Sequence, residues 1–329
     1  MKHLLWPSSV ALALLLPLAL CGADPISEMA EFSVFGKVNL AELEKGGVMT
    51  AAGSPMSTER YLSVQSCFLI PQPPAKVIAA MRQFNPAAHR ELDVLFHTDL
   101  SGSPTAADFS KLNRPADNRA LQTLSAATEK MSPDLQISRT EAQAFSPGKS
   151  FFAFWSELLA KRVQTFLVSG AAGEPAYDHT RNPVQPGKEF AGLVRQQPKV
   201  NRQFGSLLGS TGLTGGKGSL KPELYWELIE VEDAGVLTLG ASYTHSNGGG
   251  YQVADGLYYA SGGFNVSLTL HQLWPIDLGG RPSTLVWRGD FTSATSLGEL
   301  HGIERLASEG AMRKDISRAV TIFQHEASR

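Results

Sequence analysis

The sequence predicts an α+β fold: a curved antiparallel sheet covered by a long C-terminal helix, with an additional helical and loop insertion in the middle. Three observations predict it. Residues 223–291 alternate in side-chain type and break at short glycine turns, which is typical of an antiparallel meander. Residues 301–327 place apolar side chains at helical spacing. Residues 98–221, before this meander, are mixed in composition and contain helical patterns.

Length and composition set the broad class. The chain has 329 residues, of which 43% are hydrophobic and 18% are charged, so it can bury a sizeable core. A formal net charge of -2 offers no concentrated basic surface, and we expect no nucleic-acid partner. Neither an H-E-x-x-H pattern nor paired Cys or His residues at metal-ligand spacing occur in the chain. We therefore expect no metal and no cofactor.

The N-terminus predicts export. Residues 1–23 match a signal peptide, with a short positive start and an apolar run from Val10 to Leu20 that is too short to span a bilayer. Cleavage would leave a mature chain from Asp24, in the periplasm or outside the cell. In the alternative, Cys21 is acylated as in a bacterial lipoprotein, which would hold the protein near a membrane; Leu20 departs from the small residue expected there.

The first part of the mature chain combines an arm and a strand. Residues 24–58 carry turn-forming pieces and are expected to form an N-terminal arm. Residues 61–70 alternate as a strand and are followed by a proline-led helix. If Cys21 leaves with the signal peptide, Cys67 is the remaining cysteine, so no disulfide framework can form. A buried apolar role for Cys67 is favoured over a nucleophilic one, because it lies in the strand.

The middle of the chain has two parts. Residues 150–168 carry a stripe of aromatic and aliphatic side chains at helical spacing and predict a core helix. Residues 169–221 are rich in Gly, Pro and polar residues with little periodicity. Segments of that kind are typically lids, binding loops or disordered. The sequence does not decide whether residues 169–221 form a lid or a disordered segment.

The last two predicted strands carry unlike faces. In residues 264–291, Leu268, Leu270 and Trp287 point to one face, and His271 and Arg288 point to the other. An apolar face of this kind must be covered by another element.

The C-terminal segment is the expected cover. Its apolar stripe consists of Met312, Ile316, Ala319, Val320 and Phe323. We therefore expect the last helix to lie on the apolar face of the sheet.

This order of elements resembles that of a known superfamily. The stretch "YLSVQSCFLIPQPPAKVIAAM", and "LHQLWPIDLGGRPSTLVWRGDF" leading into "GIERLASEGAMRKDISRAVTIF", resemble the START-like, or helix-grip, superfamily. The resemblance implies a START-like domain over residues 59–329, with an insertion around 98–221 that is larger than the fold requires. It also implies a cavity between sheet and helix. The residues expected to line it are Trp226, Leu268, Leu270, Trp287, Arg288, Met312 and Ile316.

The resemblance leads to one functional expectation and two alternatives. Members of the superfamily generally hold an apolar ligand, so we expect an exported protein that binds a lipid or other apolar small molecule. One alternative is a secreted interaction protein without a ligand. The other is a START-like enzyme of cyclase or hydratase type, for which His245, His271 and Asp290 are the candidate catalytic residues. We expect a binding protein rather than an enzyme.

Overall fold

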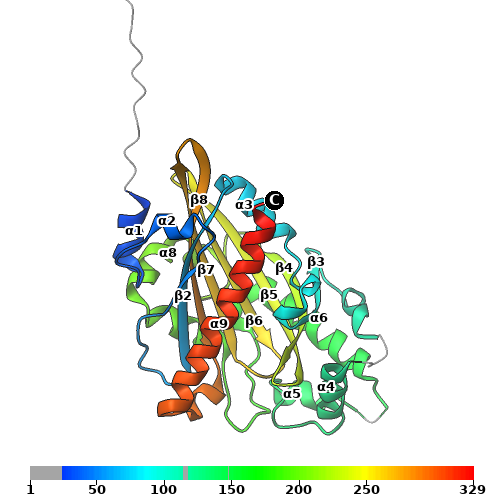
Figure 1. Cartoon of the computed structure of the whole chain (residues 1–329). Coiled ribbons are helices and arrows are strands. Elements are labelled where there is room, and N and C mark those ends of the chain that lie inside the picture. The colour runs from blue at the N-terminus through cyan, green and yellow to red at the C-terminus, as the bar shows by residue number, and fades with distance from the viewer. Residues whose placement is uncertain (1–23, 114–117, 147) are drawn as a thin grey trace, which may run out of the picture.

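The computed structural model describes residues 24–113, 118–146 and 148–329 and has an α+β fold built on a curved antiparallel sheet (Figure 1). Within these residues the sheet has eight strands in the order β1-β2-β8-β7-β6-β5-β4-β3. Their bounds are Met49–Ala52 (β1), Tyr61–Ile70 (β2), Val94–Leu100 (β3), Glu223–Val231 (β4), Ala234–Asn247 (β5), Gly250–Ala260 (β6), Val266–Leu278 (β7) and Arg281–Ser293 (β8). The predicted curved sheet followed by a C-terminal helix is confirmed.

Glycine turns join the strands of the meander, as the sequence predicts. Between β7 and β8, Gly279 and Gly280 adopt φ values of 62° and 85°, a region that strongly favours glycine. The first long strand then pairs with the last, in antiparallel register from Tyr61 opposite Ser293 to Ile70 opposite Thr284. This pairing brings the strand near the start of the predicted domain beside the last strand of the meander.

Helices occupy the segments between and around the strands. They are α1 (Pro25–Phe32), α2 (Leu40–Leu43), α3 (Pro74–Gln83), α4 (Arg119–Glu129), α5 (Arg139–Gln143), α6 (Phe151–Ser169), α7 (Pro186–Arg195), α8 (Pro198–Ser210) and α9 (Gly302–Ala327). Short 3-10 helices are η1 (Pro86–Ala88), η2 (Arg90–Leu92), η3 (Ala106–Asn113), η4 (Ala171–Gly173) and η5 (Thr295–Glu299). Residues 101–222, between β3 and β4, thus hold five of the nine α-helices in the described chain.

The interpretation of residues 169–221 as a lid or a disordered segment is wrong, because α7 and α8 lie within it and are packed into the core. Pro186 and Pro198 open these helices, in the first turn where a missing N–H costs no hydrogen bond. Phe190 and Phe204 are fully buried. Glycine and proline here end and begin helices instead of preventing them.

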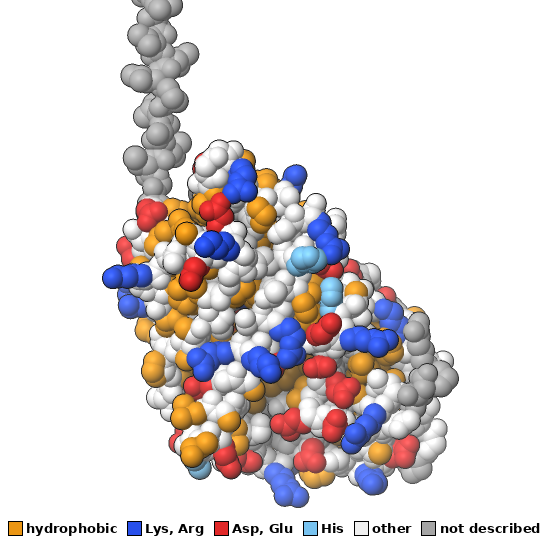
Figure 2. Space-filling model, in the orientation of Figure 1, with side chains coloured by type: hydrophobic (Ala, Val, Ile, Leu, Met, Phe, Trp, Pro, Cys, Tyr) orange, Lys and Arg blue, Asp and Glu red, His pale blue; other side chains and the backbone are white. Residues whose placement is uncertain are grey.

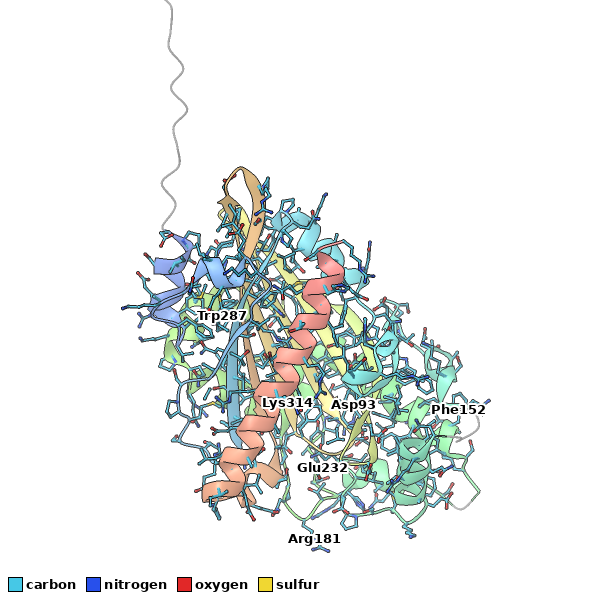
Figure 3. All side chains as sticks on the ribbon, viewed as in Figure 1. Asp93, Phe152, Arg181, Glu232, Trp287 and Lys314 are labelled. Atoms are coloured by element: carbon cyan, nitrogen blue, oxygen red, sulfur yellow. The ribbon has the colours of Figure 1, made fainter. Side chains whose placement is uncertain are left out.

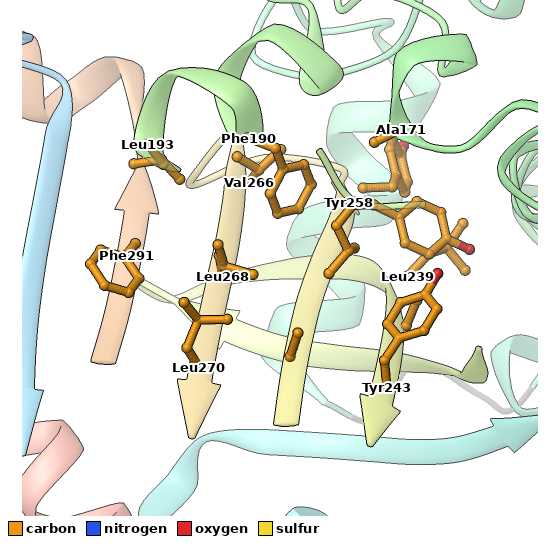
Figure 4. Packing of buried hydrophobic residues seen from close by; sticks show 14 of the residues in the cluster. Ala171, Phe190, Leu193, Leu239, Tyr243, Tyr258, Val266, Leu268, Leu270 and Phe291 are labelled. Carbon is orange, nitrogen blue, oxygen red and sulfur yellow. The ribbon is translucent and has the colours of Figure 1, made fainter. Parts of the chain in front are cut away.

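The two faces of the sheet are covered by different helices. We call the side that carries Leu268, Leu270 and Trp287 the helical face, because α1, α4, α7 and α8 lie against it or against one another there. Figure 4 shows Phe190 and Leu193 of α7 packed over β7 and β8. The expectation that the last helix covers this apolar face is wrong. An amphipathic stripe specifies that a helix is covered, but it does not specify which surface covers it.

Aromatic side chains fill the helical face. The ring of Trp287 has its centroid 4.9 Å from that of Phe32 and 5.5 Å from that of Phe204. Phe166 of α6 stacks on Tyr258 of β6 at 3.9 Å. Full burial of one such side chain contributes roughly 1.5–3 kcal/mol, with about 0.5–1.5 kcal/mol more for a well-oriented aromatic pair. This face is therefore the main hydrophobic core.

A buried charge cluster lies in the same core. Arg162 of α6 is 1% exposed and donates to Glu141 at 2.7 Å and to Glu174 at 3.2 Å. Its guanidinium lies over the ring of Tyr259, 4.2 Å from the centroid. Burial opposes the charge of Arg162, but Glu141 and its other neighbours raise the pKa of this guanidinium above its usual value. Arg162 is therefore a paired core residue on the buried side of α6.

The opposite side, which we call the α9 face, is covered by α3 and α9. In Figure 1, α9 crosses in front of the sheet. Ile316 and Val320 of α9 pack with Val64 and Phe68 of β2 and with Val286 of β8. The predicted stripe on the helix is thus correct, and its partner surface is the other face of the sheet. The predicted N-terminal arm also joins the fold, since α1 and β1 lie within it.

Candidate functional site

A cavity of about 330 Å³ lies between the α9 face and the helices over it; we call it the α9 cavity. Its floor is the sheet from β3 to β8, and its walls are α3, η1 and α9. Figure 2 shows Lys and Arg side chains along the outside of α9 on this side of the molecule, and Figure 3 marks Lys314 on α9 and Trp287 on the strands behind. The volume falls at the lower end of the range of small-molecule sites, about 300–1,000 Å³.

The strand register aligns polar side chains in a row across the floor. Ser242 of β5 lies opposite Asp255 of β6, Asp255 lies opposite Thr269 of β7, and Thr269 lies opposite Asp290 of β8. Opposite residues in neighbouring strands have their Cβ atoms about 4.5–5.5 Å apart, close enough for the side chains to interact. The hydroxyl of Thr269 donates to Oδ1 of Asp290 at 3.0 Å. The row therefore places these four polar side chains next to one another on neighbouring strands.

Tyr225 of β4 reaches across β5 into this row. Its hydroxyl donates to Oδ1 of Asp255 at 2.5 Å, although a whole strand lies between β4 and β6. The ring crosses β5 above Gly240, where an added Cβ would lie 2.1 Å from Cζ of Tyr225. A glycine at this position is therefore required for the hydrogen bond.

The pKa of the Asp255 carboxyl is higher than that of an ordinary aspartate. Burial raises the pKa of Asp255 to about 6, while hydrogen bonds from Tyr225 and Ser242 oppose the increase and the charge of Glu227 adds to it. Burial and the charge of Asp255 raise the pKa of Tyr225 well above its usual value, so the phenol stays protonated. Within the described chain, no Lys, Arg or His forms an ion pair with Asp255.

A second polar pair lies at the β3 edge of the cavity. Nδ1 of His97 lies 2.9 Å from Oε1 of Glu227, and its Nε2 lies 3.6 Å from Oδ1 of Asp99. Burial would lower the pKa of His97, but the hydrogen bond and charge of Glu227 together with Asp99 raise it above the usual value. The two carboxylates therefore favour the protonated ring.

His271 and Arg288 form a next row of the floor, directly opposite each other on β7 and β8. Arg288 donates to both carboxylate oxygens of Asp290, at 2.7 to 3.1 Å. Burial, and then the charge of Arg288, lower the pKa of His271 well below its usual value. Its Nδ1 is buried and has no hydrogen-bond partner in the described structure. The ring is thus neutral, and His271 contributes to the lining of the cavity.

The walls supply the apolar part of the cavity. They consist mainly of Ile78, Met81, Phe84, Pro86, Ala319 and Phe323. Phe84 and Phe323 meet edge to face with ring centroids 5.5 Å apart. A ligand here would have a polar group on the sheet and an apolar body against the helices.

The predicted lining residues do not share one cavity. Trp226, Leu268, Leu270 and Trp287 lie in the core of the helical face. Met312 and Ile316 lie in the cluster under α9, on the other side of the sheet.

Of the predicted set, Arg288 lies in the α9 cavity, where it is joined by the catalytic candidate His271. Asp290 lies beside it, bound to Arg288. His245 is exposed near the end of β5. His245, His271 and Asp290 are the three candidates for catalysis, and none of the observed contacts tests that role.

Sequence reasoning missed Tyr225, Asp255, His97 and Glu227. The signal that could have indicated them is the presence of apolar side chains on the α9 face as well, as at Val253. A sheet with apolar residues on both faces must be covered twice. Polar residues between such positions are then enclosed, and are not in open solvent.

Other chemical features are accounted for by packing. Among the described side chains, no group of three or more His, Cys, Asp or Glu is placed to hold a metal ion. Cys67 is buried, and burial raises the pKa of its thiol to about 12, so it is not an activated nucleophile. None of the helices in the part of the chain that the structure describes combines the length and apolar character needed to cross a bilayer. Residues 1–23, with the predicted signal peptide and Cys21, lie outside this part.

No protein-family model, no curated protein and no solved structure matches the chain.

Proposed function

We propose that the protein binds a small molecule with a largely apolar body, such as a lipid, in the α9 cavity. The observation that carries the proposal is the cavity itself. It is about 330 Å³, with apolar helical walls and a polar floor that includes Asp255, Thr269 and His271. A concave site with apolar walls and a few convergent polar groups is the usual form of a ligand site.

The START-like resemblance is part of the same proposal. Its support is the order of elements: β2, then α3, then the strands β3 to β8, then α9 across the sheet. On this interpretation residues 101–222 are an insertion between two neighbouring strands, and the ligand lies between sheet and C-terminal helix. Export to the periplasm or outside the cell is proposed from residues 1–23 alone, with acylation of Cys21 as the alternative.

The test fills the cavity from α9. Ala319 lines the cavity, whereas Ala311 lies exposed on the same helix. We expect the wild type and Ala311→Trp to bind the neutral hydrophobic probe N-phenyl-1-naphthylamine, and Ala319→Trp to lose at least about tenfold in affinity, or about 1.4 kcal/mol. Native mass spectrometry of each protein would show whether a hydrophobe co-purifies.

Two outcomes would count against a ligand site. Equal probe binding by all three proteins would place the probe elsewhere. Absence of both probe binding and any co-purifying molecule in the wild type would favour an interaction protein without a ligand. Circular dichroism spectra of the two Trp variants would establish that both are folded.

A second candidate function is proton-transfer catalysis in the same cavity. It is favoured by the Tyr225 hydroxyl at 2.5 Å from Asp255, a carboxyl whose pKa burial raises to about 6. A general base must have a pKa near the working pH and must reach the proton that it takes. A bound molecule recovered chemically altered by the wild type and unaltered by Asp255→Asn would support this function over simple binding.

A further inference from the structure

The charges in the α9 cavity point to the chemistry of its ligand. We propose that the cavity binds an organic cation, a protonated amine carrying an apolar body, with its ammonium group on the floor near Asp255 and His271. This inference rests on the proposed ligand site and specifies the class of molecule that the site takes.

The first argument is the surplus of negative charge. Four carboxyl groups, those of Asp99, Glu223, Glu227 and Asp255, line the cavity together with two guanidinium groups, those of Arg82 and Arg288. A cavity lined predominantly by one sign of charge concentrates ligands of the opposite sign. His97 offsets part of the surplus, since it lies between Glu227 and Asp99.

The second argument is that both guanidinium groups are already paired. Arg288 is bound by both oxygens of Asp290, at 2.7 to 3.1 Å. Arg82 lies 2.8 Å from a carboxylate oxygen of Glu223, at the exposed mouth of the cavity. An anionic ligand would have to displace these carboxylates. The cavity is therefore poorly suited to a carboxylate or phosphate group.

The third argument concerns hydrogen-bonding groups that still lack partners. Asp255 receives hydroxyl donors from Tyr225 and Ser242; the charge of Arg288 acts on it, but within the described residues no Lys, Arg or His forms an ion pair with it at contact distance. His271, on the neighbouring strand, is neutral, and its buried Nδ1 has no partner among the described residues. A neutral imidazole presents one nitrogen as an acceptor. An ammonium group, with three N–H donors, can bind the Asp255 carboxylate, and the neutral His271 ring beside it adds no competing positive charge.

The walls account for the rest of the ligand. Phe84 and Phe323 lie in the walls that α3 and α9 form on the α9 face, opposite the floor. They suit a hydrocarbon or aromatic body, and aromatic rings also attract cations. The combination favours an amphipathic amine over a neutral lipid.

The experiment compares three probes that differ only in the head group: octylamine, octanol and octanoate. Isothermal titration calorimetry at neutral pH would measure their affinities for the full protein. We expect octylamine to bind about tenfold more tightly than octanol, because hydrogen bonds to charged groups contribute more than neutral ones, and octanoate to bind most weakly. The comparison needs no variant, so it does not depend on refolding.

Two variants locate the effect. Asp255→Asn should reduce the affinity for octylamine about tenfold and that for octanol by a smaller factor, because hydrogen bonds to charged groups contribute more than neutral ones. Asp315→Asn is the matched control, because Asp315 is exposed on the outer side of α9, with 65% of its side chain accessible; it should change neither affinity.

The outcomes separate this inference from the proposed function. If octanol or octanoate binds the wild type as tightly as octylamine, the cationic ligand is refuted while the binding site stands. If Asp255→Asn leaves the preference for octylamine unchanged, the placement of the ammonium group beside Asp255 is refuted. If none of the three probes binds and N-phenyl-1-naphthylamine does not bind either, the ligand site itself is refuted.

Discussion

The two faces of the sheet differ in the way they are covered. On the helical face, aromatic side chains such as Trp287 are fully buried against α1, α7 and α8. On the α9 face, apolar contacts occupy the β2 side, whereas the β3 to β8 side encloses a cavity over polar residues such as Asp255. The same strands supply both faces, because alternate residues point in opposite directions. The helical face therefore provides most of the hydrophobic stabilisation, and the α9 face carries the polar and titratable side chains of the cavity.

The difference explains why a polar cavity can persist in this fold. Burial of polar groups costs free energy unless they are hydrogen-bonded, and the floor satisfies most of its own groups through Tyr225, Thr269 and Arg288. The core of the helical face provides the hydrophobic stabilisation that the cavity does not. The unpartnered Nδ1 of His271 remains as a cost.

The largest expected difference comes from removing one aromatic side chain on each face. Trp287→Ala should lower the free energy of unfolding by about 3–5 kcal/mol, because it leaves a cavity in a closed core. Phe323→Ala, at the wall of the α9 cavity, should cost only about 1 kcal/mol, since water can already enter that space. Urea unfolding measures both. Equal losses would contradict the assignment of stability to the helical face.

A smaller effect is expected at the strand between Tyr225 and Asp255. Gly240→Ala should displace the Tyr225 ring, whose Cζ would lie 2.1 Å from the new Cβ, and cost about 1–3 kcal/mol. Gly205→Ala on α8 has no neighbouring atom within 4 Å and should raise stability by up to about 1 kcal/mol. Thermal unfolding of the two variants provides the comparison. If Gly240→Ala leaves the melting temperature unchanged, the Tyr225 ring does not require the space above residue 240.

The smallest effect is the pH dependence of Asp255. Its pKa is raised by burial to about 6 in the folded protein, from an ordinary value of 3.8. A raised pKa means that the stabilising contribution is full below the unfolded value and is lost as the pH rises through about 6. Relative to Asp255→Asn, the wild type should therefore lose about 1 kcal/mol between about pH 4 and pH 7, an amount limited by water in the cavity.

The comparison of wild type and variant isolates this carboxyl from other titrating groups. The polar groups that face Asp255 or influence its charge are Tyr225, Glu227, Ser242, Thr269, His97, His271 and Arg288. Urea unfolding across the pH range gives the measurement, and a constant difference between the two proteins would remove Asp255 from the acid–base properties of the cavity. Binding of an amine should show the opposite trend and weaken below about pH 6, because a protonated carboxyl no longer attracts a cation.

Several elements could be predicted from the sequence for identifiable reasons. The helix at residues 151–169 was indicated by its aromatic stripe, and the turn at Gly279 and Gly280 by its position between two alternating segments. Helices α7 and α8 were missed because their glycine and proline residues suggested a loop. In the candidate site, Arg288 and His271 could be selected from the sequence. The sequence did not show that both lie in the cavity under α9.

The sequence alone determined the alternation along each strand, the glycine turns between strands and the apolar stripe of the last helix, because these depend on residues close together in the chain. Only the tertiary structure decided which face of the sheet α9 covers, since a stripe does not name its partner surface. It also decided that Tyr225 meets Asp255, because that contact needs the strand order and the open space above Gly240.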